Sequence, residues 1–277
     1  PRPPRTHTNW ATSLRQIHSS RGTNGSPPVR DLAYLALSGA GFHSPETSPR
    51  QWFDENTAAL RGLSFERSGF QICIANGSEA LKRQTAKLIE RMYSARGLFP
   101  YGMHANIDPR DIAVVALLDG EAVATATIRV DHGGGLLADT LYSKEIDHVR
   151  ATGGRVCEIT QLAIDPESGS HEALAGVMQA VFVITQATRR VTDIFAEVNP
   201  RHAGFHQRVF GFRRVGVEKI CPRVNAPAVL LHLPLAEFEE RVARHERLMH
   251  VNGDRVHRLL PDPVQSRQLI QAMTGKA

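Results

Sequence analysis

The chain has 277 residues, of which 42% are hydrophobic and 22% are charged, an ordinary balance for a globular protein. Its 33 Lys and Arg residues are largely balanced by 28 Asp and Glu residues, which leaves a net charge of +5. No basic block resembles a nucleic-acid-binding motif. Three widely spaced cysteines exclude a disulfide framework and a Cys-x-x-Cys metal site, and no apolar run reaches the roughly 18 to 20 residues of a membrane span. We therefore expect no nucleic-acid partner, no metal and no membrane span, while peripheral membrane contact stays open.

The N-terminal region differs in composition from the rest of the chain. Its first 30 residues are rich in Pro, Arg, Ser, Thr, Asn and Gly, which bury too little apolar surface to offset chain entropy. An apolar stretch at 32–41 loosely imitates a signal peptide, but it lies too far into the chain, and a short packed helix explains it better. We interpret residues 1–60 as a mostly disordered leader with a short helix, and we expect a cytoplasmic protein.

Beyond this leader, hydrophobic periodicity and turn residues predict alternating strands and helices. Strands are expected at 69–75, 112–118, 121–130, 156–164, 193–198, 215–220 and 228–233. Helices are expected at 79–95, 143–150, 171–188, 200–210 and 236–249. Local chemistry sets three boundaries, namely a helix N-cap at Ser78, a hairpin turn at Asp119-Gly120 and a helix end at Gly211. The residues after the last helix predict a loose tail.

Hairpins come first in this order and helical crossovers follow, which predicts an α/β fold with a mixed central sheet and flanking helices. The order is similar to that of the GNAT (Gcn5-related N-acetyltransferase) fold. Two segments, GLLADTLYSKEIDHVRATGGRVCEITQLAIDP at 135–166 and another at 198–235, closely resemble the core of FeeM-type N-acyl amino acid synthases. These are relatives of the acyl-homoserine lactone synthases. The resemblance covers roughly residues 70–235 and implies a GNAT-like N-acyltransferase core at 66–235, while the ends of the chain, the leader at 1–60 and a C-terminal helix and tail at 236–277, lie outside it.

The resemblance also implies a reaction, the transfer of a long-chain fatty acyl group to the α-amine of an amino acid by direct attack on a thioester. The donor is expected to be acyl carrier protein or coenzyme A, whose phosphopantetheine arm threads a gap between two splayed parallel strands. No bound cofactor is expected. Two alternatives stay open: an acyltransferase with another acceptor, such as ornithine or a homoserine lactone precursor, and a non-catalytic protein that binds acyl groups or the carrier protein.

Amide formation from a thioester needs a neutral amine and donors for the developing oxyanion. Glu158 is a carboxylate inside the apolar strand 156–164, where a charge is rare without a role or a partner. The resemblance places it where the autoinducer synthases carry a Glu that assists amine deprotonation. The alternative is a structural salt bridge, for example to Arg129. The resemblance places Arg129 near the acceptor site, and otherwise it reaches solvent from a strand end.

The run Glu158-Ile159-Thr160-Gln161 departs from the Glu-x-x-Arg of the related synthases. Strict alternation puts Glu158 and Thr160 on one face of the strand and Gln161 on the other, and a β-bulge would bring all three together. Loss of the Arg side chain removes a fixed charge and a bidentate fork. We expect either a changed amino-acid specificity or weak or lost activity.

The resemblance extends to the helix at 200–210. His206 stands where FeeM-like sequences have a Tyr, and many GNAT enzymes use a Tyr in this helix to protonate the leaving thiolate. His206 is therefore a candidate proton donor, and the alternative is a solvent-facing histidine. Asn199 either holds the pantetheine amides or caps the helix. The expected site residues are the catalytic pair Glu158 and His206, with Arg129, Thr160, Gln161 and Asn199 as substrate-binding residues.

Three further features bear on the donor and the acyl chain. The turn at 165–170 lacks the glycine-rich loop that grips coenzyme A pyrophosphate, which favours a carrier-protein donor. A basic rim would steer an acidic carrier protein, although a solvated face explains any single arginine better. The rim arginines are Arg189, Arg190, Arg201, Arg208, Arg213 and Arg214. Cys157 and the other cysteines are interpreted as buried apolar residues, and the apolar helix at 171–188 as core or as part of an acyl tunnel.

Overall fold

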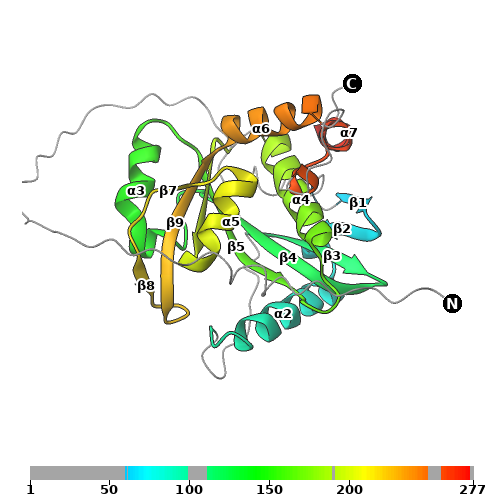
Figure 1. Ribbon diagram of the computed structural model, residues 1–277, viewed down its shortest axis with the longest axis horizontal. Coiled ribbons are helices and arrows are strands. Elements are labelled where there is room, and N and C mark those ends of the chain that lie inside the picture. Colours follow the sequence, from blue (N-terminus) through cyan, green and yellow to red (C-terminus); the bar gives the residue numbers. More distant parts are fainter. Residues whose placement is uncertain (1–59, 61, 99–110, 189–190, 249–256, 275–277) are drawn as a thin grey trace, which may run out of the picture. The chain divides into compact units, whose positions relative to one another are not determined.

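The computed structural model describes residues 60, 62–98, 111–188, 191–248 and 257–274, so the predicted leader lies almost entirely outside the described residues. Figure 1 shows a mixed sheet with helices on both of its faces. The strands are β1 (Ser64–Arg67), β2 (Phe70–Ile74), β3 (Ile112–Leu118), β4 (Glu121–Val130), β5 (Val156–Ile164), β6 (Asp193–Val198), β7 (Arg213–Arg214), β8 (Lys219–Cys221) and β9 (Ala226–Pro234). The helices are α2 (Glu79–Ser94), α3 (Asp139–Ala151), α4 (His171–Thr188), α5 (Pro200–Phe210), α6 (Leu235–Leu248) and α7 (Pro263–Thr274), with 3-10 turns η1 (Ala75–Gly77) and η2 (His257–Leu259).

The strand order is β1-β2-β3-β4-β5-β6-β9-β7, and β8 pairs with β9 outside this path. Within this path β5 and β6 pair in parallel, while the other neighbours pair antiparallel. The mixed α/β sheet predicted from the element order is therefore confirmed. Its single parallel pair lies in the middle of the sheet, between the N-terminal meander and the C-terminal strands.

Short-range chemistry placed three element boundaries correctly, whereas the helix predicted at 143–150 begins four residues earlier, at Asp139. The Ser78 hydroxyl accepts the backbone N–H of Leu81 at 3.3 Å, so it caps α2 as predicted. Asp119 and Gly120 both have positive φ, 51° and 83°, as a tight hairpin turn between β3 and β4 requires. Gly211 has a φ of 90° and ends α5 in the left-handed conformation.

The strand predicted at 215–220 is confirmed only at its end, where Lys219 and Ile220 belong to β8. The preceding strand β7 ends at Arg214, and although the Val215 N–H still donates to the carbonyl of Leu230 at 3.0 Å, the chain then leaves the ladder to close over Tyr142 of α3. A Cβ at Gly216 would lie 2.6 Å from the Tyr142 ring, and the Tyr142 hydroxyl donates to the carbonyl of Val217 at 3.0 Å. A tertiary contact that periodicity cannot report therefore interrupts the strand.

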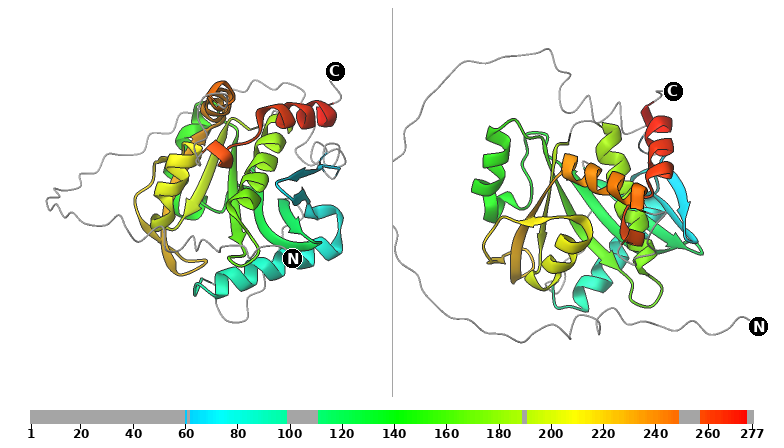
Figure 2. Two further views of the ribbon diagram at one scale, coloured as in Figure 1. Left: turned by 45° about the vertical axis from the view of Figure 1, so that its right-hand side comes forward. Right: turned by 45° about the horizontal axis from the view of Figure 1, so that its top comes forward.

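The loose tail predicted after 249 is also wrong where the structure describes it. Helix α7 packs against α4 (Figure 2), and Leu260, which is 3% exposed, belongs to the main core. Arg67 fastens this segment to β1, because its guanidinium donates to the carbonyls of Arg258 and Leu260 at 2.8 and 2.9 Å. The C-terminal segment is therefore part of the packed domain.

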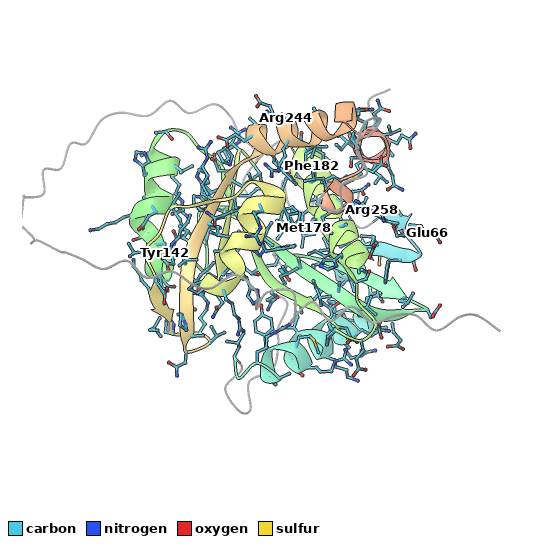
Figure 3. All side chains as sticks on the ribbon, in the orientation of Figure 1. Glu66, Tyr142, Met178, Phe182, Arg244 and Arg258 are labelled. Carbon is cyan, nitrogen blue, oxygen red and sulfur yellow. The ribbon has the colours of Figure 1, made fainter. Side chains whose placement is uncertain are left out.

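The two faces of the sheet have different roles. On one face, Ala124, Ala126 and Ile128 of β4 pack into a large apolar core beneath α4. Figure 3 labels Met178 and Phe182, which contribute to this core from α4. The opposite face carries Thr125, Thr127 and Arg129 and is covered in part by α2 and α3. No helix among the described residues is both long and apolar enough for a membrane span.

Candidate active site

The parallel strands β5 and β6 separate in the middle of the sheet. They pair at Val156 with Asp193, Cys157 with Ile194 and Glu158 with Phe195. Strand β5 nevertheless continues to Ile164, and β6 continues to Val198. We call the stretch beyond Glu158 and Phe195 the strand divergence. Among the described residues, the β5–β6 ladder does not extend into this stretch, so we expect the backbone groups that face across it to be available to a substrate.

The β-bulge expected in β5 is present. Thr127 pairs with Thr160 and Thr125 pairs with Ala163, so Gln161 and Leu162 together oppose one residue of β4. Gln161 has a φ of 51°, which is uncommon for a residue with a side chain. Its Oε1 accepts a hydrogen bond from the Thr127 hydroxyl at 2.9 Å. The bulge therefore brings Gln161 to the face that carries Glu158 and Thr160.

Glu158 lies at the start of the strand divergence and is 1% exposed. Burial raises the pKa of Glu158 from its ordinary value of 4.5 to about 7. The backbone N–H of Ala138, which donates to Oε2 at 3.1 Å, and the charge of Arg223 both act in the opposite direction. The charge of Glu197 raises the pKa further. Glu158 is therefore a buried carboxylate that exchanges its proton near neutral pH.

The alternative of a Glu158–Arg129 salt bridge is wrong. The two residues oppose each other in the register of β4 and β5, but the Arg129 guanidinium turns to Asp111 instead. Its Nε and Nη2 donate to the two carboxylate oxygens of Asp111 at 2.9 and 2.8 Å. The Arg129 side chain is 19% exposed, so it does not reach freely into solvent either. Within the ranges that the structure describes, no arginine forms an ion pair with Glu158.

A network around Arg150 secures the loop that carries the Glu158 donors. Arg150 of α3 donates to Asp131 and Asp139 at 2.8 Å each, and to Asp147 at 2.7 Å. Asp131 begins the loop and Asp139 ends it, so one guanidinium closes the loop at both ends. Leu137 and Ala138, whose backbone N–H groups hydrogen-bond Glu158, lie inside it.

A second carboxylate lies in this region, that of Glu197 on β6, which was not predicted from the sequence. It lies two residues beyond Phe195 and therefore on the same face as Glu158. Its side chain is 6% exposed, and its Oε1 accepts from Nη2 of Arg223 at 2.9 Å. Nη1 of Arg223 donates to the carbonyl of Leu137 at 2.7 Å. Alternation along 193–198 gives the face of Glu197, but only the fold brings Arg223 to it.

The structure distinguishes the two interpretations of Asn199. Its Oδ1 accepts the backbone N–H of Arg201 at 3.2 Å, so Asn199 caps α5. Its predicted contact with the pantetheine amides stays a prediction.

His206 is 8% exposed, so the solvent-facing alternative is wrong. It packs against the rings of Phe205, Phe210 and Phe212 at centroid distances of 5.7 to 6.0 Å. Burial lowers the pKa of His206 to about 4, with a smaller effect from the charge of His202. The imidazole is therefore neutral near pH 7, which weighs against a proton-donor role.

The turn between β5 and α4 is already satisfied internally. The Ser170 hydroxyl accepts the backbone N–H groups of Glu172 and Ala173 at 3.1 and 3.3 Å. Asp165 forms an ion pair with Arg91 at 2.8 Å. The side chains of Asp165 and Glu167 also place negative charge in this turn. The amides that would hold a pyrophosphate at this helix N-terminus are thus capped by a side chain.

The predicted basic rim is exposed on α5 and β7 at Arg201, Arg208, Arg213 and Arg214. Arg213 forms an ion pair with Glu237 at 2.7 Å, and Arg189 and Arg190 lie outside the described residues. Three apolar side chains are exposed in the adjoining segment, namely Val215 (40%), Val217 (68%) and Ile220 (58%). Basic and apolar groups therefore share one stretch of surface.

Cys157 is fully buried in the core, on the face opposite Glu158, and burial raises the pKa of its thiol. Cys221 is buried beside Glu197, whereas Cys73 is only half-buried, contrary to expectation. Thus Cys157 has the environment of a structural cysteine. In the part of the chain that the structure describes, no cluster of three or more His, Cys, Asp or Glu residues is arranged to hold a metal ion.

Comparison with known proteins identifies the family. The sequence model of the N-acyl amino acid synthase FeeM family matches residues 84–234, which is more than half of the chain. The solved structure of FeeM, an N-acyl amino acid synthase from uncultured soil microbes, is 22% identical with a TM-score of 0.54, covering 63% of this chain and 96% of that one. The AHL synthase LasI is 16% identical with a TM-score of 0.46, covering 60% of this chain and 89% of that one.

A third structure, Escherichia coli ElaA, is 14% identical with a TM-score of 0.41, covering 59% of this chain and 97% of that one. No curated protein sequence matches the chain. The family match spans β4, β5 and β6, and with them the strand divergence and Glu158. The protein is therefore an acyltransferase with a GNAT-like fold, and it belongs to the FeeM family of N-acyl amino acid synthases.

Proposed function

We propose that this protein transfers a long-chain fatty acyl group from acyl carrier protein to the α-amine of an amino acid. The observation that carries the proposal is Glu158, a buried carboxylate with a pKa of about 7 where β5 and β6 separate. An amine in solution is an ammonium ion and cannot attack a thioester until it loses a proton. A base with a pKa near the working pH is suited to take that proton.

The reaction proceeds in three steps. The acceptor ammonium gives one proton to the Glu158 carboxylate and becomes a neutral amine. Its nitrogen then bonds to the thioester carbon, and the oxyanion that forms accepts hydrogen bonds from β5 backbone N–H groups at the strand divergence. Finally the carbon–sulfur bond breaks, and the leaving thiolate takes a second proton from the same nitrogen. Glu158 returns its proton to solvent, and the products are an amide and a thiol.

Two features support acyl carrier protein as the donor. Ser170 caps the amides at the N-terminus of α4, and acidic side chains stand in the turn before them, which disfavours coenzyme A pyrophosphate. The rim formed by α5, β7 and the following segment combines exposed arginines with Val217 and Ile220. Such a surface complements an acidic partner that also offers apolar side chains. This donor places the reaction in the cytoplasm.

The acceptor is proposed to lie on the Glu158 face. Thr160 and Gln161 are half-buried there, so they are proposed to contact the amino acid. The bidentate pair of Arg129 and Asp111 flanks this position on β4. His206 is left out of proton transfer, because a ring that is neutral near pH 7 is a poor acid.

The purified full chain, given acyl carrier protein or coenzyme A loaded with the same acyl group, tests this function. A mixture of the common L-amino acids serves as acceptor, and both free thiol and N-acyl product are measured. We expect a higher kcat/KM with the acyl carrier protein thioester. Equal or better use of acyl coenzyme A would contradict the proposed donor. Stable binding of the loaded carrier without thiol release would favour the non-catalytic alternative.

A further inference from the structure

Arg223 bridges three elements around the candidate base. It lies between β8 and β9, 26 positions after Glu197 in the sequence, and its Nη2 donates to Oε1 of Glu197 on β6 at 2.9 Å. Its Nη1 donates to the carbonyl of Leu137 at 2.7 Å. The next peptide N–H along that loop, that of Ala138, donates to Glu158 at 3.1 Å. One guanidinium therefore links Glu197 to the peptide segment that holds Glu158.

The two charged side chains of this bridge, Glu197 and Arg223, differ in how far they are buried. The Glu197 side chain is 6% exposed, and within the described ranges no N–H or O–H group donates a hydrogen bond to its buried Oε2, although the Cys221 thiol lies against this carboxylate. An unsatisfied buried carboxylate oxygen is costly, so the position of Arg223 on Oε1 matters for the stability of this arrangement. Arg223 itself is 33% exposed on its side chain. The pair is thus asymmetric, with a buried anion and a partly solvated cation.

Other charged or titratable groups around the bridge are accounted for. From β3 and β4, Asp111 and Arg129 neutralise each other through two hydrogen bonds. Tyr93 of α2 and Cys221 of β8 lie near Arg223, and burial raises the pKa of both, so each is neutral near pH 7. Among the groups that the structure describes, the side-chain charges that shift the pKa of Glu158 are those of Arg223 and Glu197, and they act in opposite directions.

We propose that Arg223 is a positioning residue for Glu158, which holds the 136–138 loop on the carboxylate and, together with Glu197, sets the local charge under which Glu158 exchanges its proton. This inference rests on the proposed function, in which Glu158 is the base. The charge of Arg223 and the shape of its guanidinium should have two effects that different substitutions can separate. The charge of Arg223 governs the pH at which Glu158 titrates, while its planar fork governs how firmly the loop is held.

The test is a carbon-13 NMR titration of side-chain carboxyl groups in the full chain labelled at glutamate, with the Glu158 signal assigned by its loss in Glu158→Gln. We expect Arg223→Gln to move the Glu158 midpoint up by about one pH unit and Glu197→Gln to move it down by a similar amount. The double variant Arg223→Gln/Glu197→Gln should titrate between them, near the wild-type midpoint. If Arg223→Gln alone fails to fold, the comparison of the double variant with Glu197→Gln isolates Arg223, because the midpoint should be about one pH unit higher in the double variant.

Two further variants separate charge and geometry from general disruption. Arg223→Lys keeps the charge but cannot reach both partners, so its midpoint stays near that of wild type while kcat falls about tenfold. Arg241→Gln is the matched control, because Arg241 also donates to backbone carbonyls, those of Val209 and Arg208, away from Glu158. We expect it to leave the midpoint unchanged.

The same Glu158 midpoint in the double variant as in Glu197→Gln would overturn the inference, as would shifts of both single variants in the same direction. The titration needs no turnover. If the Glu158 midpoint does not shift in Arg223→Gln while the enzyme still transfers acyl groups, the role of Arg223 is rejected and the proposed function is not. Opposite shifts in a protein without acyl transfer would uphold that role and reject the proposed function.

Discussion

The backbone N–H of Ala138 donates to Oε2 of Glu158 at 3.1 Å, although the two residues lie 20 positions apart on different elements. Ala138 ends a loop, and Glu158 lies within a buried strand. This hydrogen bond stabilises the ionised carboxylate against burial, which by itself favours the protonated form. The loop at 131–138 is therefore part of the environment that keeps Glu158 able to act near neutral pH.

Replacement of Glu158 by Gln removes the base while it retains an oxygen that accepts from Ala138. We expect kcat/KM to fall at least about 100-fold. In wild type, activity should rise as the pH increases through about 7, because the ionised form accepts the proton. The pH dependence of kcat/KM measures both effects. Glu121→Gln, an exposed change at the start of β4, is the control, and equal activity of both variants would remove Glu158 from the mechanism.

The same substitution also predicts a pH-dependent gain in stability. The pKa of Glu158 is higher in the folded chain than in the unfolded chain, so the folded state binds more protons between pH 4.5 and about 7. The stability of wild type relative to Glu158→Gln should therefore be greatest below this window and decline as pH rises through it. Urea unfolding at about pH 8 should favour the variant by roughly 1 to 3 kcal/mol compared with about pH 5. A difference that is constant with pH would contradict the raised pKa.

Arg150→Lys tests the loop that supports Glu158. Lysine keeps the charge but cannot donate simultaneously to Asp131, Asp139 and Asp147 with the geometry of the guanidinium. We expect kcat to fall about tenfold, and the acidic limb of the pH–rate profile to move to higher pH as the amide donors loosen. Lys144→Gln changes an exposed residue on the same helix and should leave both unchanged. An unaltered profile in Arg150→Lys would show that the loop holds its position without this network.

Gln161→Arg introduces the residue of the related pattern. A cation on the Glu158 face favours the ionised carboxylate, so the acidic limb should move to lower pH by about one unit. The substitution also removes the acceptor of the Thr127 hydroxyl, so the KM for the amino acid should change as well. Kinetics as a function of pH and acceptor concentration measure both quantities. An identical pH profile would mean that the side chain at 161 points away from Glu158 in solution.

The C-terminal segment should carry measurable stability. Leu260 is 3% exposed, so Leu260→Ala should lower the free energy of unfolding by about 2 to 5 kcal/mol. Val264 on α7 is 52% exposed, so Val264→Ala should change it by less than about 0.5 kcal/mol. Urea unfolding of the two variants makes the comparison. Equal free energies of unfolding for the two variants would show that this segment is a loose tail, as its sequence predicts.

The fold was largely predictable from the sequence because local signals set most of it. Periodicity gave the bounds of β3, β5, β6, α4 and α5, and turn chemistry gave the Asp119-Gly120 hairpin. The predictions failed where a distant contact outweighs the local pattern. The chain around Gly216 and Val217 leaves the ladder to close over Tyr142, and Arg67 of β1 fastens the segment just before α7 at Arg258 and Leu260.

The candidate site was predictable in its centre but not in its partners. A carboxylate inside an apolar strand drew attention to Glu158, and the neighbouring departure at Gln161 suggested the bulge. The partner of Arg129 was missed because Asp111 lies just before β3, and only the pairing of β3 with β4 brings it to Arg129. Glu197 and Arg223 were missed because their relation to Glu158 depends on the parallel register of β5 and β6.

Mass spectrometry of lipid extracts tests the central claim most directly, in cells that express the full chain or its Glu158→Gln variant at equal soluble levels. We expect a new N-acyl amino acid in the first extract and its loss in the second, and the mass of the product identifies the acceptor and the acyl chain. The same product at equal abundance in both extracts would contradict the role of Glu158. The absence of any new N-acyl amine in either extract, with acyl carrier protein co-expressed, would contradict the proposed reaction.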